Sequence, residues 1–228
     1  ICLGVVGVVW VLWGYSLAFG NDVGGFVGDL GFFGLRNVGF DEAFPGTAIP
    51  HLLFMAFQMM FAVITPALIT GAFAERMKFC SFIVFVVAWV TIVYAPLAHW
   101  VWGGGWMATE LQAIDFAGGT VVHINAGIAA VAAALIIGKR RFTSTVVPHN
   151  VPFVVLGAAL LWFGWFGFNA GSALSSGGGA ANAFVTTNSA AAMAALTWVA
   201  LSWFHTGKAS VVGAAVGAVA GLVAITPA

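Results

Sequence analysis

Long runs of apolar residues alternate with short polar segments along this 228-residue chain. An apolar run of about 20 residues is the length that an α-helix needs to cross the hydrocarbon core of a bilayer. The pattern therefore predicts an all-α fold, a polytopic transmembrane helical bundle in which seven helices are visible. The predicted spans cover about residues 1–19, 50–73, 80–102, 118–138, 151–173, 183–204 and 209–228.

Composition is typical of a chain that lies in lipid. Hydrophobic residues make up 62% of it and charged residues only 6%, whereas a soluble domain carries about 25% charged residues. A net charge of zero argues against a nucleic-acid partner, because such a surface needs clustered Lys and Arg. Cys2 and Cys80 lie far apart inside apolar runs, which indicates neither a disulfide framework nor a cysteine metal site. We expect no metal and no cofactor.

The two ends of the chain indicate a piece of a longer protein. The chain begins at Ile1 inside an apolar run and ends at Ala228, where the last helix should be finishing. The first run lacks the basic n-region and the small-residue cleavage site of a signal peptide. We therefore expect residues 1–228 to form part of one transmembrane domain.

Basic residues are confined almost entirely to alternate loops. Of the seven basic residues, only Arg36 falls on the opposite side. The positive-inside rule then predicts that the loops with the other six basic residues are cytoplasmic. These six are Arg76, Lys78, Lys139, Arg140, Arg141 and Lys208. The protein is thus expected to be a multi-pass protein of the cell membrane. Acidic residues other than Glu75 lie on the outer side, which favours a cationic solute over an anion. They are Asp22, Asp29, Asp41, Glu42, Glu110 and Asp115.

A histidine occurs in the middle of one apolar span. His123 follows Asp115 by eight residues, or about 12 Å of helix, which predicts a position near the bilayer midplane. An ionisable side chain is costly there. Its own helical face holds small residues, so we expect it to point to a helix contact or a cavity, with a plain hydrogen bond across a helix interface as the alternative. The small face consists of Gly119, Thr120, Ala126, Gly127 and Ala130, and the opposite face of Val121, Ile124, Ile128, Val131 and Leu135.

Asp115 is too far from His123 to form an acid–base couple with it. The aspartate stands just before Gly118 and Gly119, at the start of the apolar run. That position suits a carboxylate that accepts hydrogen bonds from backbone N–H groups as a helix cap or a loop tie. We predict a structural role at the mouth of the site.

Aromatic and hydroxyl side chains recur at helical spacing on other spans. Phe168 lies one turn from Ser172, and Phe57 lies one turn from Phe61 with Gln58 beside it. Together with Trp102, at the outer end of the third span, these rings can present π faces to a cation. The alternative is ordinary packing of the rings, with the Ser172 hydroxyl bonded to a backbone carbonyl.

Four segments of the chain resemble the ammonium transporter family (Amt/Mep/Rh), on its Amt branch. The likeness extends along practically the whole chain, and it is carried by residues 71–79, 96–105, 115–127 and 165–172. It implies a fold of eleven transmembrane helices, of which this chain holds about the second to the eighth. It also implies a homotrimer with one pore through each subunit.

The resemblance implies a role for each candidate residue. Trp102 and Phe61 resemble the aromatic residues of an outer ammonium site, with Ser172 as its hydrogen-bond acceptor. Phe61 and Phe168 resemble the two stacked rings that close the pore. His123 resembles the first of two paired pore histidines, and Asp115 the residue that holds the recruitment site in shape; the second pore histidine belongs to a later helix. Positions near the pore with less defined roles are Phe57, Gln58 and Thr226. The other histidines of the chain do not take the place of the second pore histidine; they are His51, His99, His149 and His205.

The implied function is transport rather than enzymatic catalysis. The protein would serve nitrogen uptake by recruiting NH4+, with methylammonium as an analogue, deprotonating it and conducting ammonia past the pore histidine. A PII-type regulatory protein would bind the cytoplasmic loops 139–150 and around Lys208. The alternative within the family is an ammonium sensor whose signalling domain lies outside these residues.

Two other membrane classes fit the residues less well. A retinal photoreceptor needs a lysine inside a helix, and every Lys here lies in a loop or at a helix end. An intramembrane serine protease needs a nucleophile and a base in contact. His123 and Ser172 are about 10 Å or more apart by depth, and the chain has no G-x-S-x-G elbow.

Overall fold

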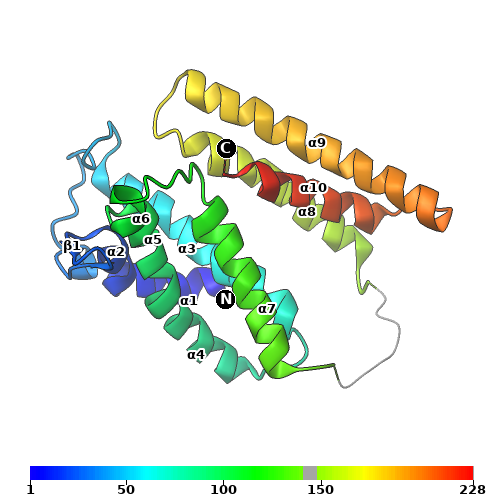
Figure 1. Ribbon diagram of the computed structural model, residues 1–228, viewed down its shortest axis with the longest axis horizontal. Helices are drawn as coiled ribbons and strands as arrows, with labels where there is room; N and C mark the ends of the chain where they lie inside the picture. Colours follow the sequence, from blue (N-terminus) through cyan, green and yellow to red (C-terminus); the bar gives the residue numbers. More distant parts are fainter. Residues whose placement is uncertain (141–147, 228) are drawn as a thin grey trace. The chain divides into compact units, whose positions relative to one another are not determined.

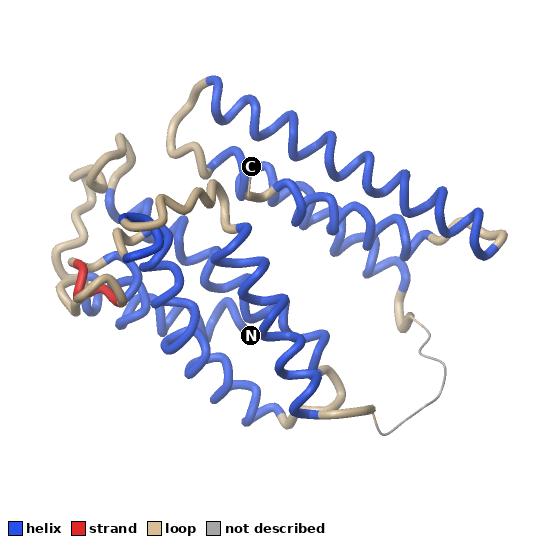
Figure 2. Tube along the Cα trace, viewed as in Figure 1, coloured by secondary structure: helices blue, strands red, loops and turns tan. Residues whose placement is uncertain are grey.

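The computed structural model describes residues 1–140 and 148–227. The chain forms two compact units, Ile1–Phe142 and Thr143–Ala228, and each is built mainly from helices (Figures 1 and 2), which confirms the predicted all-α fold. Arg141, one of the six basic residues predicted to be cytoplasmic, lies outside the described residues, as does Ala228.

The first unit contains most of the elements, including one small hairpin. In chain order they are α1 (Cys2–Val9), η1 (Trp10–Gly14), α2 (Tyr15–Phe19), β1 (Asp22–Val23), β2 (Val27–Gly28), η2 (Phe33–Leu35), α3 (His51–Phe73), α4 (Phe79–Trp89), η3 (Val90–Tyr94), α5 (Ala95–Trp102), α6 (Trp106–Thr109), η4 (Gly119–Ile124) and α7 (Asn125–Ile137). The second unit contains α8 (Val151–Trp165), η5 (Phe166–Ala170), α9 (Gly178–Thr206) and α10 (Val211–Ile225). The element η2 is a 3₁₀ turn, and the other four η elements are π-helical.

Six helical stretches within the described residues are long and apolar enough to cross a membrane. They cover Cys2–Phe19, His51–Phe73, Phe79–Thr109, Gly119–Ile137, Val151–Ala170 and Gly178–Thr206. The seventh predicted helix, at 209–228, is α10, a shorter apolar helix of 15 residues, Val211–Ile225.

Four of these stretches contain a π-helical turn in their interior or at one end. In η4, for example, the backbone N–H of His123 donates to the carbonyl of Gly118, five residues earlier, at 3.1 Å. A π turn inserts one extra residue into an α-helix and shifts every following side chain around the axis, and such turns are frequent at functional sites. Two predicted site residues, His123 and Phe168, lie in π turns.

The helices of the first unit pack around buried aromatic side chains. α3 contacts α1 and α7, and α2 contacts α5. Trp10, Tyr15 and Tyr94 are completely buried, and the indole N–H of Trp10 donates to the Met55 carbonyl at 3.2 Å. Because lipid tails are as apolar as these side chains, close packing and hydrogen bonds between helices, rather than escape from water, hold such a bundle together.

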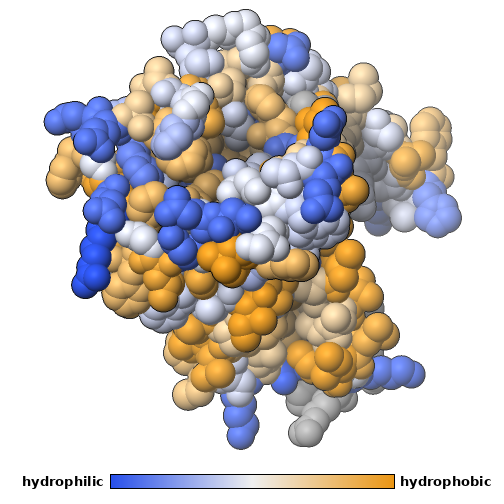
Figure 3. Space-filling view, turned by 60° about the vertical axis from the view of Figure 1, so that its left-hand side comes forward, coloured by the Kyte–Doolittle hydropathy of each residue, from blue (hydrophilic) through white to orange (hydrophobic). Residues whose placement is uncertain are grey.

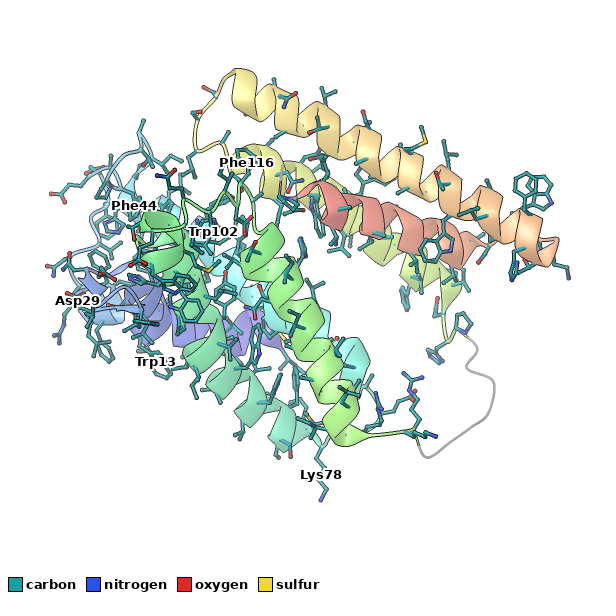
Figure 4. All side chains as sticks on the ribbon, viewed as in Figure 1. Trp13, Asp29, Phe44, Lys78, Trp102 and Phe116 are labelled. Atoms are coloured by element: carbon teal, nitrogen blue, oxygen red, sulfur yellow. The ribbon has the colours of Figure 1, made fainter. Side chains whose placement is uncertain are left out.

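The two ends of the first unit differ in chemistry. Asp29 and Phe44 lie at the end with the β1–β2 hairpin, and Lys78 lies at the opposite end (Figure 4). The face in Figure 3 shows hydrophilic residues gathered across its upper part and a broad apolar area below them. The assignment of the two ends to an outer and a cytoplasmic side stays a prediction.

Arg76 connects two helices at the end with Lys78. Its guanidinium donates to the carbonyl of Ala72, in the last turn of α3, and to that of Gly138, which follows α7. Carbonyl groups at helix C-termini lack intrahelical partners and carry the negative end of the helix dipole, so a cation is favourable there. Arg76 thereby ties the two helices that carry Phe61 and His123.

The second unit is held together by very close helix contacts. α8, α9 and α10 lie side by side (Figure 2), and α10 contacts both of the others. A Cβ atom on Gly217 would lie 2.7 Å from Cβ of Trp198, and one on Gly221 would lie 2.5 Å from the Ala190 carbonyl oxygen. Only glycine permits this approach of α10 to α9, as at other small-residue interfaces between membrane helices.

Candidate functional site

Three aromatic rings predicted to face a cation come together in the first unit. The rings of Phe61 and Trp102 meet edge to face, with centroids 5.7 Å apart and planes at 84°. Phe57 extends the group, with its centroid 4.9 Å from that of Phe61. Such T-shaped pairs are the favoured geometry of aromatic rings. Phe61 is only 1% exposed, so the pair is anchored on one side in the core.

Asp115 caps the helix that carries His123. Its Oδ1 accepts hydrogen bonds from the backbone N–H groups of Gly118 and Gly119 at 2.8 and 2.7 Å. Its Oδ2 accepts from those of Thr120 and Val121 at 2.8 and 3.0 Å. These four donors are the orphan N–H groups that every helix start leaves without intrahelical partners. The cap predicted from the position of Asp115 is confirmed.

The same residue also fixes Trp102. The indole N–H of Trp102 donates to the backbone carbonyl of Asp115 at 2.8 Å. Trp102 lies at the end of α5, beside the loop that leads into η4 and α7 (Figure 4). Asp115 therefore holds the ring through its main chain and the helix start through its carboxylate, which makes the position of the aromatic pair and that of His123 interdependent.

His123 is half-buried and lies in the π turn that Asp115 caps. From its predicted small face, Gly119 and Ala126 are buried and Gly127 is exposed. On the opposite face, Ile124, Ile128, Val131 and Leu135 are exposed. Val121, the fifth residue of that face, is completely buried and lies inside the π turn, where the α-helical angle of 100° per residue does not apply.

Gln58 is buried between the two predicted phenylalanine positions of α3. Its side chain is 7% exposed, and its Oε1 has no hydrogen-bond partner among the described residues. A buried polar atom without a partner is uncommon in folded proteins. The atom is able to accept a hydrogen bond from a donor that enters the site.

Ser172 and Phe168 occur in the second unit, at the end of η5. The Ser172 hydroxyl donates to the Phe168 carbonyl at 2.7 Å, which is the backbone bond expected under the packing alternative. A hydroxyl has one donor and two acceptor lone pairs. With its proton engaged, Ser172 presents an acceptor to any further partner. The Phe168 ring lies against Trp165, with centroids 5.0 Å apart.

Thr226 has a hydrogen-bonded position in the same unit. It is completely buried, accepts from the Trp165 indole N–H at 3.0 Å and donates to the Leu222 carbonyl at 2.8 Å. Thr226 therefore connects α10 to α8. The predicted groupings of Phe61 with Phe168, and of Trp102 with Ser172, join the two units and stay predictions.

The sequence carries no signal for one contact between a histidine and an aspartate. His99, 0% exposed, lies with its Nε2 2.8 Å from Oδ1 of Asp22, which is 42% exposed. The two residues are 77 positions apart, so no spacing rule connects them. The hydrogen bond from His99, together with one from the Gly25 N–H, holds the pKa of Asp22 below its ordinary value.

The lowered pKa of Asp22 predicts a loss of stability in acid. Because the pKa in the folded protein is below the ordinary 3.8, the bonds stabilise the fold above about pH 4 and are lost as the pH falls through the lowered pKa. We expect the unfolding temperature of the full-length protein to fall between about pH 5 and pH 2, and less steeply in Asp22→Asn. Asp41→Asn, in the same outer segment, is the control, and equal slopes for the two variants would contradict the prediction.

Within residues 1–140 and 148–227, no group of three or more His, Cys, Asp or Glu side chains is placed to hold a metal ion.

Comparison with known proteins gives consistent matches over the whole chain. Residues 1–228 match the Ammonium Transporter Family. An ammonium transporter of Bacillus subtilis is 53% identical over 99% of the chain. The crystal structure of Mep2 from Saccharomyces cerevisiae superposes with a TM-score of 0.92 at 43% identity, and covers all of the chain. A structure described as a sensor Amt protein also covers all of it, with a TM-score of 0.87 at 34% identity.

The chain is shorter than these proteins. It spans 55% of the Bacillus subtilis transporter, 53% of the Mep2 chain and 58% of the sensor chain. It therefore corresponds to about half of each.

Proposed function

Because the chain belongs to the ammonium transporter family, as its match over residues 1–228 establishes, we propose that the complete protein conducts ammonium-derived nitrogen across the cell membrane. In this proposal residues 1–228 are part of one transmembrane domain, about the second to eighth of its helices. NH4+ is recruited at an outer site, loses a proton, and ammonia crosses an apolar pore.

The observation that carries this proposal is the fixed edge-to-face pair of Phe61 and Trp102. An aromatic face attracts a cation by roughly 0.5–2 kcal/mol. Trp102 keeps a defined orientation because its N–H is bonded to Asp115. Aromatic attraction does not separate NH4+ from K+, so selectivity requires an acceptor for N–H, which Ser172 provides with its free lone pairs.

The pore below excludes ions that cannot give up their charge. Taking a bare cation from water into apolar surroundings costs several kcal/mol even after relaxation. NH4+ avoids this cost by releasing a proton, whereas K+ cannot. In the proposal Phe61 and Phe168 close the pore, with Phe57, Gln58 and Thr226 near it, and His123 is the polar contact inside it. A neutral imidazole has one donor and one acceptor nitrogen, so it binds ammonia and relays a proton to a paired partner.

Replacing Ser172 by alanine tests the outer site. We expect the half-saturating ammonium concentration of the full-length protein to rise about tenfold, because a hydrogen bond to a charged group contributes about 1.5–3 kcal/mol, while the maximal flux changes less. The matched control is Ser175→Ala, since the exposed Ser175 hydroxyl also donates to a backbone carbonyl, that of Ala173 two residues earlier. An unchanged affinity in Ser172→Ala would remove this residue from the site.

Transport itself is tested by ion currents across proteoliposomes after concentration jumps. A saturable current with ammonium, none with potassium, and uptake of methylammonium support the proposal. Ammonium binding without current or uptake in the full-length protein would indicate a sensor. The superposition on the sensor Amt protein is the reason to keep that alternative. A sensor would retain the outer site, and its signalling domain would lie outside residues 1–228.

The proposed assembly is a homotrimer, and the proposed regulator is a PII-type protein. The basic loops around Lys78, 139–150 and Lys208 would face the cytoplasm and receive the regulator. The mass of the detergent-solubilised full-length protein tests the trimer. Co-purification of a PII protein under several nucleotide conditions tests the regulator, and its absence under all of them would count against it.

A further inference from the structure

His99 contacts two separate segments at the outer end of the first unit. Its Nδ1 lies 3.0 Å from the Ala18 carbonyl oxygen, at the end of α2, and its Nε2 lies 2.8 Å from Oδ1 of Asp22, in β1. A carbonyl and a carboxylate both accept hydrogen bonds. The ring therefore has an acceptor within hydrogen-bond distance of each nitrogen and connects the two segments.

The main chain of His99 shapes the turn that follows Trp102. Its carbonyl accepts hydrogen bonds from the backbone N–H groups of Gly103 and Gly105 at 3.0 and 2.9 Å. A Cβ atom on Gly103 would lie 2.0 Å from the Ala18 carbonyl oxygen and 2.6 Å from Nδ1 of His99. The ring of His99, the end of α2 and the turn after Trp102 are thus in direct contact.

Two more bonds fasten the β1–β2 hairpin to the same region. The backbone N–H of Trp106 donates to the Gly25 carbonyl at 3.0 Å, and the indole N–H of Trp100 donates to the Phe26 carbonyl at 2.8 Å. Trp100 precedes Trp102 in the sequence, and Trp106 follows it. The hairpin consequently lies against the short stretch of chain from which the Trp102 ring projects.

Trp102 is held from two directions. Its indole N–H is bonded to Asp115 on the side of α7, and its main chain is held by the hairpin and α2 on the other side. The fully buried side chain of His99 joins both the hairpin and α2 to α5.

We propose that the His99–Asp22 pair is a latch that positions Trp102 for cation binding. The inference rests on the proposed function, because it takes Trp102 as one face of the outer ammonium site. His99 does not touch the substrate here. It acts by holding the end of α5 against the hairpin, so that the ring keeps the position from which it meets Phe61.

Two amide replacements of His99 in the full-length protein separate its two bonds. His99→Asn places an amide donor near the position of Nδ1, toward Ala18, but is too short to reach Asp22. His99→Gln extends a donor toward the position of Nε2. We expect the half-saturating ammonium concentration to rise about three- to tenfold in His99→Asn, comparable to the loss of part of one cation–π contact, with a maximal rate within about twofold of the parent. His99→Gln should restore most of the affinity.

A double substitution tests whether the latch acts through Trp102. In a Trp102→Ala background, His99→Asn should raise the half-saturating concentration no further, because residues that act through one contact are not additive. Asp41→Asn, which removes one negative charge from the same outer segment, should leave the affinity within about twofold, since exposed charges are screened by salt. The latch would be overturned if His99→Asn and Trp102→Ala raised the half-saturating concentration by independent factors that multiply in the double variant. It would also be overturned if His99→Asn and His99→Gln raised that concentration equally.

Nitrogen-15 NMR of histidine-labelled full-length protein tests the contact without transport. We expect the resonances of the His99 ring, identified by their absence in His99→Gln, to shift in Asp22→Asn. Resonances that stay unchanged in Asp22→Asn would overturn the latch. Absence of ammonium current and binding in the parent would overturn the proposed function instead, so the two failures are distinguishable.

Discussion

Replacing Asp115 by alanine is expected to destabilise the full-length protein more than any other substitution at the site, and to abolish ammonium current. The change removes the acceptor of four backbone N–H groups at the start of the helix that carries His123. Each buried donor left without a partner costs about 1–3 kcal/mol. Because water reaches part of this helix start, we expect a total loss of about 4 kcal/mol or more. The unfolding temperature in detergent and the proteoliposome current measure the two effects.

Two further variants distinguish the cap from the loss of a charge. Asp115→Asn keeps one carbonyl oxygen for two of the four donors, while its NH2 group faces the other two, so an intermediate stability is expected. Asp29→Ala removes a carboxylate that also accepts backbone N–H bonds, from Asn21 and Gly31, but in the outer loop of the first unit. Asp29→Ala should keep its current. If it lost as much current as Asp115→Ala, the special role of Asp115 would be refuted.

Replacing His123 by alanine is the second large expected effect. The substitution removes the imidazole that the proposal assigns to binding ammonia and relaying a proton. Positioned acid–base groups typically contribute on the order of 10²-fold or more to a proton-transfer step. We expect the ammonium current to fall by about that factor, or to persist only with admission of potassium. Currents after ammonium and potassium jumps measure both outcomes.

The control for this change is another histidine. His205→Ala alters the exposed His205 in the last turn of α9 and should leave current and selectivity unchanged. A His123→Ala protein with normal ammonium current and normal exclusion of potassium would end the relay hypothesis. Loss of current in both variants would indicate a general effect on folding.

Several features of the fold could be predicted from the sequence because their causes are local. The length of an apolar run decides whether a helix can cross a bilayer, and six of the seven predicted spans are confirmed. The cap at Asp115 involves partners only three to six positions away, so the aspartate followed by Gly118 and Gly119 was a sufficient signal. The seventh, at 209–228, is present as the shorter apolar helix α10, whose bounds composition alone does not give.

The faces of helices were predictable only where the helix is regular. The angle of 100° per residue grouped Ile128, Leu135 and Val121 on one face. Ile128 and Leu135 are exposed, whereas Val121, inside the π turn η4, is completely buried. A π turn depends on which carbonyl each N–H group bonds, and tertiary packing decides between neighbouring choices of nearly equal energy.

The sequence by itself determined the class of the protein and its helices, and it supplied the candidate residues and the acidic and basic loops on which the proposals rest. Those properties follow from apolar length, charge and side-chain chemistry along a continuous stretch of chain. Only the tertiary structure decided which of these residues meet. Phe61 joined Trp102, and His99 joined Asp22 across 77 positions, because such contacts depend on how whole helices pack and on where small residues let them approach.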